Sequence, residues 1–212
     1  MFALLYSIFD LLWIAVFVLI IRRGFIDKTF GMPLAAAVVN LSWDFMVSFI
    51  YPAPAPQVYF EVLFIVFDAI IIVQALRFWR SEFPALSPGL FYAALVLIAI
   101  TSWALMLAVR VDFKDSLSVY SGFSGNLMGS ILFVVMLFQR HDLRGQSFYI
   151  ALFKWIGTGS ASLAFMLYRL PGYEQSLLVP VLCIGMFVFD LLYVVLVYQM
   201  CRKQGINPWT RV

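Results

Sequence analysis

The stretch from Phe2 to Ile21 reads FALLYSIFDLLWIAVFVLII and contains one charged side chain, Asp10. A helix of this length and composition crosses the hydrocarbon core of a bilayer, which is about 30 Å thick. No Lys or Arg precedes the stretch, and Asp10 interrupts its apolar run, which argues against a cleaved signal peptide. We therefore expect a retained transmembrane helix that carries an acid at membrane depth.

Further apolar stretches of spanning length follow the first one. They cover Met32–Tyr51, Val58–Phe78, Leu90–Val109, Leu117–Phe138, Phe148–Leu170 and Ser176–Met200. Hydrophobic residues make up 64% of the chain and charged residues 12%, a composition that excludes a soluble domain of this length. The sequence predicts an all-α, multi-pass integral membrane protein, with residues 1–212 forming a single bundle of seven transmembrane helices.

The basic residues are distributed unequally between the two ends of the predicted bundle. One end has ten of them: Arg22, Arg23, Lys28, Arg77, Arg80, Arg140, Arg144, Arg202, Lys203 and Arg211. The other end has three, Arg110, Lys114 and Arg169. Because basic loops stay in the cytoplasm, the N-terminus is predicted outside and the C-terminus in the cytoplasm. The net charge of +3 is thus a topology signal, and no basic face suggests a nucleic-acid partner.

Cysteine and histidine usage predicts neither a disulfide framework nor a metal centre. Cys183 and Cys201 fall far apart on one predicted helix and cannot bridge each other there. His141 is the only histidine and lies in a predicted turn, which argues against bis-histidine haem and histidine-rich metal sites. We expect no metal and no cofactor, and the sequence does not indicate an oligomeric state.

Four aspartates, Asp10, Asp44, Asp68 and Asp190, lie inside the predicted spans. An ionisable group at membrane depth costs at least about 2.5 to 3.5 kcal/mol on insertion scales, so such groups usually mark a functional site. At about 1.5 Å of rise per residue, all four fall in the outer half to middle of the membrane. Glu61 precedes Asp68 by seven residues on the same helix face, nearer the outer end. The alternative is that each acid only bonds a neighbouring helix.

Aromatic and amide side chains share helix faces with these acids. At helical spacing, Trp13 follows Asp10, Asn40 and Tyr51 flank Asp44, and Tyr193 follows Asp190. Asn126 lies in a run of small residues, where a buried amide can orient a carboxylic acid. Gly125 and Gly129 in that run favour close helix packing, although they would also leave room for a ligand.

An acid in a dry aromatic pocket disfavours ionisation and is a ready general acid. Aromatic ring faces also stabilise a cation without supplying a nucleophile that would trap it. This combination suits carbocation chemistry on an apolar substrate. A proton-coupled transporter also uses buried aspartates, so the residue types alone leave both possibilities open.

Several segments resemble one family of membrane enzymes. The stretch from Asn40 to Pro52, NLSWDFMVSFIYP, resembles the second helix of the transmembrane terpene cyclases of fungal meroterpenoid and paxilline-type indole-diterpene pathways and their bacterial relatives. The further matching pieces are Phe67-Asp68, Asn126 with Ser130-Ile131, Arg144 to Ser147, Lys154 to Thr158, and Asp190 to Tyr193. The resemblance covers most of the chain, in matching order.

The resemblance implies a terpene cyclase of isomerase or lyase type that protonates a terminal epoxide or alkene of a prenyl chain and drives ring closure. It implies a hydrophobic prenylated substrate, a membrane-lipid environment and acid initiation without a metal. The two family acids match Asp44 and Asp190, although the family commonly has Glu where this chain has Asp44. Supporting and wall residues are then Asn40, Asp68, Asn126, Asp10, Trp13, Trp43, Tyr51 and Tyr193.

Two other classes of membrane protein fit less well. A small proton-coupled transporter would explain the buried aspartates, but the buried basic groups and broken helices of such proteins are scarce here. A retinal photoreceptor needs a Schiff-base lysine, which the last predicted helix lacks. Lys154 is predicted to extend to the cytoplasmic surface as an anchor, while Arg144, Gln146 and Ser147 are predicted to cap the helix that follows them.

Overall fold

The computed structural model describes residues 1–168 and 170–212, and the regular elements in these ranges are all helices. They are α1 (Phe2–Asp27), α2 (Leu34–Phe45), the π-helical turn η1 (Met46–Ile50), α3 (Gln57–Glu82), α4 (Pro88–Asp112), α5 (Val119–Arg140), α6 (Phe148–Leu167) and α7 (Leu178–Lys203). The all-α prediction is confirmed. Arg169, which the charge count placed at the poorly basic end, lies outside the described residues.

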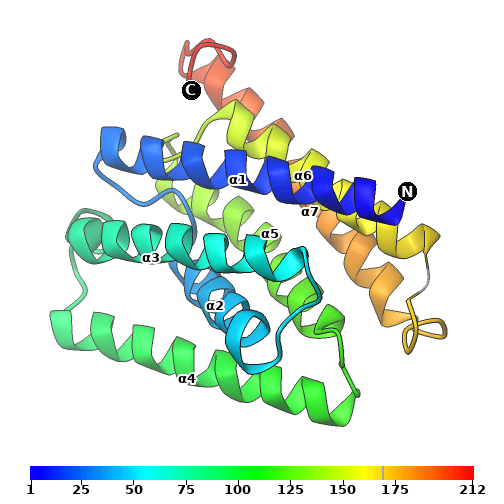
Figure 1. Ribbon diagram of the computed structural model, residues 1–212. Coiled ribbons are helices and arrows are strands. Elements are labelled where there is room, and N and C mark those ends of the chain that lie inside the picture. Colours follow the sequence, from blue (N-terminus) through cyan, green and yellow to red (C-terminus); the bar gives the residue numbers. More distant parts are fainter. Residues whose placement is uncertain (169) are drawn as a thin grey trace.

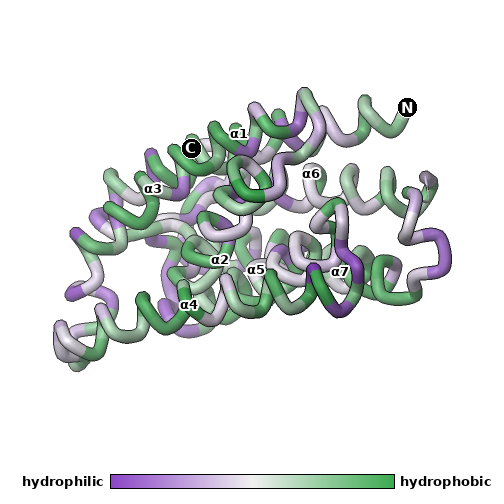
Figure 2. Tube along the Cα trace, turned by 60° about the horizontal axis from the view of Figure 1, so that its bottom comes forward, coloured by the Kyte–Doolittle hydropathy of each residue, from purple (hydrophilic) through white to green (hydrophobic). Residues whose placement is uncertain are grey.

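Six helices of the described chain are long and apolar enough to cross a membrane: α1, α3, α4, α5, α6 and α7. Large apolar side chains point away from the bundle, and Leu11, Leu97 and Val181 are each 62–63% exposed. Figure 2 shows that hydrophobic residues cover much of the helices, with hydrophilic residues gathered towards ends and connections. Because water would penalise such a surface, lipid must cover it, and the protein is an integral membrane protein.

The second helical segment, Leu34–Ile50, is shorter than the span predicted over Met32–Tyr51. Pro33 precedes its first residue, and Pro52 follows the turn that ends it. Proline supplies no backbone N–H, and it disfavours helical conformation in the residue before it, so both positions limit the helix.

Despite its length, α2 lies at the centre of one half of the bundle, in contact with α3, α4 and α5 (Figure 1). Helix α1 packs against α6 and α3, and α7 packs against α5 and α6. Helix α4 lies at the edge and contacts α2 and α5 (Figure 1). Side chains of α2 therefore face several neighbouring helices at once, which favours α2 as the carrier of a buried site.

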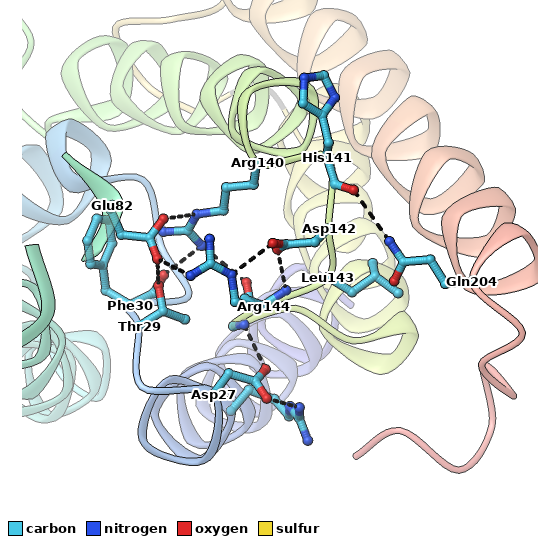
Figure 3. Close-up of polar contacts among 12 residues, drawn as sticks. Asp27, Thr29, Phe30, Glu82, Arg140, His141, Asp142, Leu143, Arg144 and Gln204 are labelled. Carbon is cyan, nitrogen blue, oxygen red and sulfur yellow. Dashed lines mark hydrogen bonds and ion pairs between the residues drawn. The ribbon is translucent and has the colours of Figure 1, made fainter. Parts of the chain in front are cut away.

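One end of the bundle is held by partly buried ion pairs, here called the charged clasp: Asp27, Glu82, Arg140, Arg144 and Arg211. Glu82 on α3 accepts from Arg140 at 3.0 Å and from Arg144 at 3.2 Å, and Thr29 donates to the same carboxylate (Figure 3). Asp27 on α1 accepts from Arg211 at 2.8 Å and from the backbone N–H of Gly145. The clasp thereby ties α1, α3 and α5 to the chain beyond α7.

Gln146 and Ser147, which precede α6, have different roles. Ser147 accepts a hydrogen bond from the N–H of Ile150, which confirms its predicted capping role. Gln146 instead joins separate parts of the bundle, because its amide donates to the carbonyl of Gly31 and accepts from the Tyr193 hydroxyl on α7. This contact lies on the clasp side of the molecule.

Candidate active site

A cavity of about 410 Å³ lies at the end of the bundle opposite the charged clasp. Its outer wall comes from the first turn of α1, the residues Ala53 to Gln57 before α3, and Leu117 to Val119 at the start of α5. Residues of α2 line the deeper part, among them Val39 and Trp43. The size is within the usual range for pockets that enclose a small organic molecule.

Most of the cavity wall is apolar and rich in aromatic rings. The aromatic residues that line it are Phe2, Tyr6, Phe9, Trp13, Phe17, Trp43, Phe64, Phe123 and Phe165. Neighbouring rings pack on one another, as Trp13 does on Phe17, with their centroids 5.7 Å apart. Such a wall excludes water and presents ring faces to a bound molecule.

Three carboxyl groups interrupt this wall: Asp10 on α1, Asp44 on α2 and Glu61 on α3. All three residues are buried, with 5% or less of their surface exposed. The amide of Gln57, at the start of α3, donates to Asp10 at 3.2 Å and to Glu61 at 2.5 Å. The cavity thus combines an apolar volume with acids that come from three helices.

Asp44 contacts two further carboxyls. Its side chain lies beside Glu61, which lines the cavity, and beside Asp68, which is fully buried. Among the described residues, no N–H or hydroxyl group donates to either oxygen of Asp68. Since a carboxylate oxygen can only accept, two carboxyls form a hydrogen bond only when one of them is protonated. Asp44 is thus placed where a proton could pass to or from a neighbouring carboxyl.

Asp190 has a different environment from Asp44. Its carboxylate pairs with Lys154 at 2.5 Å, and Lys154 also donates to Ser130 on α5 at 2.8 Å. The Lys154 ammonium lies 5.5 Å from the centroid of the Trp13 ring. Trp13 lines the cavity, whereas Asp190 is not among the described residues that line it. The ion pair is therefore next to the cavity, behind Trp13. The prediction that Lys154 is a surface anchor is wrong, because Lys154 is fully buried.

The predicted amide and tryptophan positions converge on the cavity. Asn40, Trp43 and Asn126 all line it. The Trp43 indole donates to the Ser121 hydroxyl at 3.3 Å, and its ring packs on Gly122, where an added Cβ would lie 2.8 Å from a ring carbon. Helix α5 thus fixes the Trp43 ring by a hydrogen bond and by close approach.

The sequence left two roles open for Gly125 and Gly129, room for a ligand and close helix packing, and the structure gives one role to each. Gly125 lines the cavity, with Val39 of α2 as its nearest neighbour. An added Cβ at Gly129 would lie 3.8 Å from Ala36, so Gly129 forms part of the α2–α5 packing surface.

Two predicted wall residues lie elsewhere: within the described chain, Tyr51 and Tyr193 are not among the residues that line the cavity. Tyr51 stacks under Arg110, whose guanidinium carbon lies 3.7 Å from the ring centroid. Tyr193 is fully buried and donates its hydroxyl to Gln146. Tyr51 thus contacts Arg110, and Tyr193 joins α7 to the segment before α6.

The rim of the cavity at the start of α5 is held by Asp115. Its carboxylate accepts from the backbone N–H groups of Tyr120 and Ser121, both at 3.0 Å, which satisfies the free donors of this helix end. Tyr173 donates to the same carboxylate at 2.7 Å. Burial, and after it the hydrogen bond to Asp115, raises the pKa of Tyr173 to about 12. The Tyr173 hydroxyl therefore remains protonated, and able to donate, at neutral pH.

Sequence reasoning did not select Gln57, and Glu61 was noted without being placed in the site. The sequence predicts a helix that begins at Val58, whereas in the structure α3 begins at Gln57, four residues before Glu61. This spacing puts both side chains on one helix face. The i, i+4 spacing of Gln57 and Glu61 is the feature of the sequence that could have indicated their contact.

The whole arrangement agrees with comparisons to known proteins. The chain matches the family model of the Pyr4-like transmembrane terpene cyclases over residues 1–204. The chain belongs to this family. Membership supports an enzyme over the transporter that intramembrane acids alone left open.

Curated relatives carry the same family description. The chain is 28% identical to the Pyr4-family terpene cyclase mfmH of Annulohypoxylon moriforme over 185 residues, 84% of this chain and 75% of the relative. It is 28% identical to the terpene cyclase olcD of Penicillium canescens, over 74% of this chain and 65% of the relative. For the terpene cyclase macJ of Penicillium terrestre the identity is 27%, over 75% and 64%. The match thus spans about two thirds to three quarters of these relatives. No solved structure matches the chain significantly.

Proposed function

We propose that this protein is a membrane-bound terpene cyclase that protonates a terminal epoxide or alkene of a prenyl chain and drives carbocation ring closure. The observation that carries the proposal is the Asp44 carboxyl in the wall of an apolar, aromatic cavity. A prenyl chain is an oily ligand that suits such walls. Family membership supports a substrate of this chemical class.

Asp44 is the proposed proton donor. Its O–H bond breaks as a new bond to hydrogen forms on the epoxide oxygen or on the terminal alkene carbon, and a tertiary cation develops in the prenyl chain. Neighbouring double bonds then attack the cation in turn, and loss of a proton ends the cascade. Asn40 and Asn126, which also line the cavity, are proposed to orient the acid and the substrate.

The proposed reaction is initiated by acid and uses no metal ion, because protonation creates the cation without loss of diphosphate. Asp190 is proposed as the second acid of the centre, on its match to the family pattern. The ring faces of Trp13 and Trp43 are proposed to stabilise the cation, since both line the cavity.

Product analysis tests the proposed function directly. Membranes that contain the protein are incubated with a phenol bearing a terminally epoxidised farnesyl chain and with its unepoxidised counterpart. Cyclic isomers of either compound are the expected products, and membranes with the Asp44→Asn variant serve as the control. If wild-type membranes return both compounds unchanged, this substrate class is wrong.

The orientation of the bundle is also a proposal. We expect a reporter fused after Val212 to be cytoplasmic and a tag before Met1 to be external, because the clasp end has most of the basic residues. Accessibility of the two tags to an impermeant label in intact cells measures this. Labelling of the C-terminal reporter alone would place the cavity mouth on the cytoplasmic side.

Replacing Trp43 by Leu is expected to change the product mixture more than substrate affinity. Leu keeps the cavity apolar but removes a ring face whose interaction with a desolvated cation is worth about 2 kcal/mol, so partly cyclised products should accumulate. The measurement is product distribution beside substrate affinity. Tyr193→Phe is the control, because Tyr193 lies away from the cavity. Unchanged product ratios with weaker binding would reduce Trp43 to a packing role.

A further inference from the structure

Glu61 connects the cavity to the Asp44 carboxyl. It lines the cavity, contacts Asp44 and lies one turn after Gln57, at the outer end of α3. Gln57 belongs to the segment before and at the start of α3 that forms the cavity rim. Glu61 is therefore placed between the proposed acid and the mouth of the cavity.

Gln57 holds Glu61 in this place. Its amide nitrogen carries two hydrogens and donates to Glu61 at 2.5 Å and to Asp10 at 3.2 Å. An amide does not titrate, so Gln57 fixes the two carboxyls without exchanging protons itself. An N–H donor also stabilises a carboxylate, so Glu61 is suited to carry a negative charge briefly.

Asp44 needs a source of protons after each reaction, because it becomes a carboxylate when it protonates the substrate. Asp68 contacts Asp44 but is fully buried and, within the described lining, has no place on the cavity. Asp190 is held by Lys154 behind Trp13. Glu61 is the carboxyl that both contacts Asp44 and faces the cavity towards its mouth.

We propose that Glu61 returns the proton to Asp44 between turnovers. The O–H bond of Glu61 breaks and the O–H bond of Asp44 forms, which leaves Glu61 as a carboxylate beside the Gln57 amide. Glu61 then regains a proton from the terminal cation, as that cation forms its double bond, or from water at the mouth. One proton is used and one is recovered in each turnover, so the balance of an isomerisation is kept. This inference rests on the proposed role of Asp44.

The charged and titratable groups around Glu61 are consistent with this role. Asp10 faces it from α1, both carboxyls accept from Gln57, and Asp44 faces it from α2. Tyr6 of α1 lines the same cavity. Lys154, which lies behind Trp13 in the cavity wall, is already paired with Asp190. Lys154 is therefore not free to pair with Glu61 or Asp44 and so hold either one as a carboxylate.

The test separates the first turnover from those that follow. Glu61→Gln keeps the shape of the side chain and removes its transferable proton. With enzyme in excess over the epoxidised farnesyl phenol, the single-turnover rate of this variant is expected within about 2-fold of wild type, while steady-state turnover falls about 10-fold or more. Formic acid, supplied in formate buffer, should restore steady-state turnover by donating its proton to Asp44 from the cavity and leaving as formate. Asp112→Asn, which changes an exposed carboxyl at the end of α4, is the control.

Two results would overturn the inference. One is a steady-state rate for Glu61→Gln equal to that of wild type, and the other is an equal loss in single turnover that formate does not restore. If Glu61→Gln does not fold, the wild type is measured in D2O: steady-state turnover should slow more than single turnover, and equal slowing contradicts the relay. Failure of the proposed function looks different, because wild-type protein would then return the substrate unchanged even in single turnover. Retained first turnover in Asp44→Asn would instead remove Asp44 from the acid role.

Discussion

Asp44→Asn is expected to lower cyclisation by about 100-fold or more, both in the first turnover and in steady state. The amide keeps the size of the side chain and its place in the cavity wall but has no acidic proton, and general acids commonly contribute 10²- to 10⁴-fold. The measurement is product formation by purified protein, with retained fold checked by circular dichroism. Asp112→Asn, at the exposed end of α4, is the matched control.

Asp44→Glu adds a second comparison, because the family commonly has Glu at this position. The longer acid keeps the proton and moves it farther into the cavity, so activity should remain measurable while the preference between epoxide and alkene changes. Cyclisation by Asp44→Asn at the wild-type rate would remove Asp44 from the acid role.

The second large effect is expected at the buried ion pair. Asp190→Asn should lower turnover by about 100-fold or more if Asp190 is an acid of the reaction. It should also destabilise the protein by about 3 to 5 kcal/mol, because Lys154 then loses its carboxylate partner in a buried site. Turnover and thermal unfolding in detergent are measured together.

A double variant separates these two effects. Lys154→Met with Asp190→Leu replaces the ion pair by apolar side chains of similar size, an exchange that is often neutral for stability. We expect the double variant to regain thermal stability and to remain inactive. If the double variant regained activity as well as stability, Asp190 would serve only to neutralise Lys154. Asp44 would then be the acid of the reaction without help from Asp190.

The helices could be predicted because long apolar stretches have few other solutions in lipid. A constant helical rise also predicts that Asp10 and Asp44 lie at similar heights, and both line the same cavity. The sequence does not show how far each helix is rotated about its own axis relative to its neighbours, and the expectation that Tyr193 lines the cavity depends on that rotation. Tyr193 shares a face with Asp190, but that part of α7 faces Gln146 and Lys154, away from the cavity wall.

The same limit explains Lys154. A lysine six residues after the start of a spanning helix can reach the surface or pair inside the bundle, and local sequence does not distinguish the two. Only the packing of α5 and α6 against α7 brings Ser130 and Asp190 within its reach. Gln57 was missed for a simpler reason, since prolines before it obscured the first residue of α3.

The charged clasp and the cavity lie at opposite ends of the bundle, and this separation gives the two ends different tolerance to change. Ion pairs of Glu82 and Asp27 hold the helices where no substrate is proposed to bind. Substitutions in the cavity wall can therefore alter ring number or stereochemistry without loosening the clasp, while improved pairing at the clasp adds stability without reshaping the product. A lineage of such proteins can diversify its chemistry from one end and maintain its fold from the other.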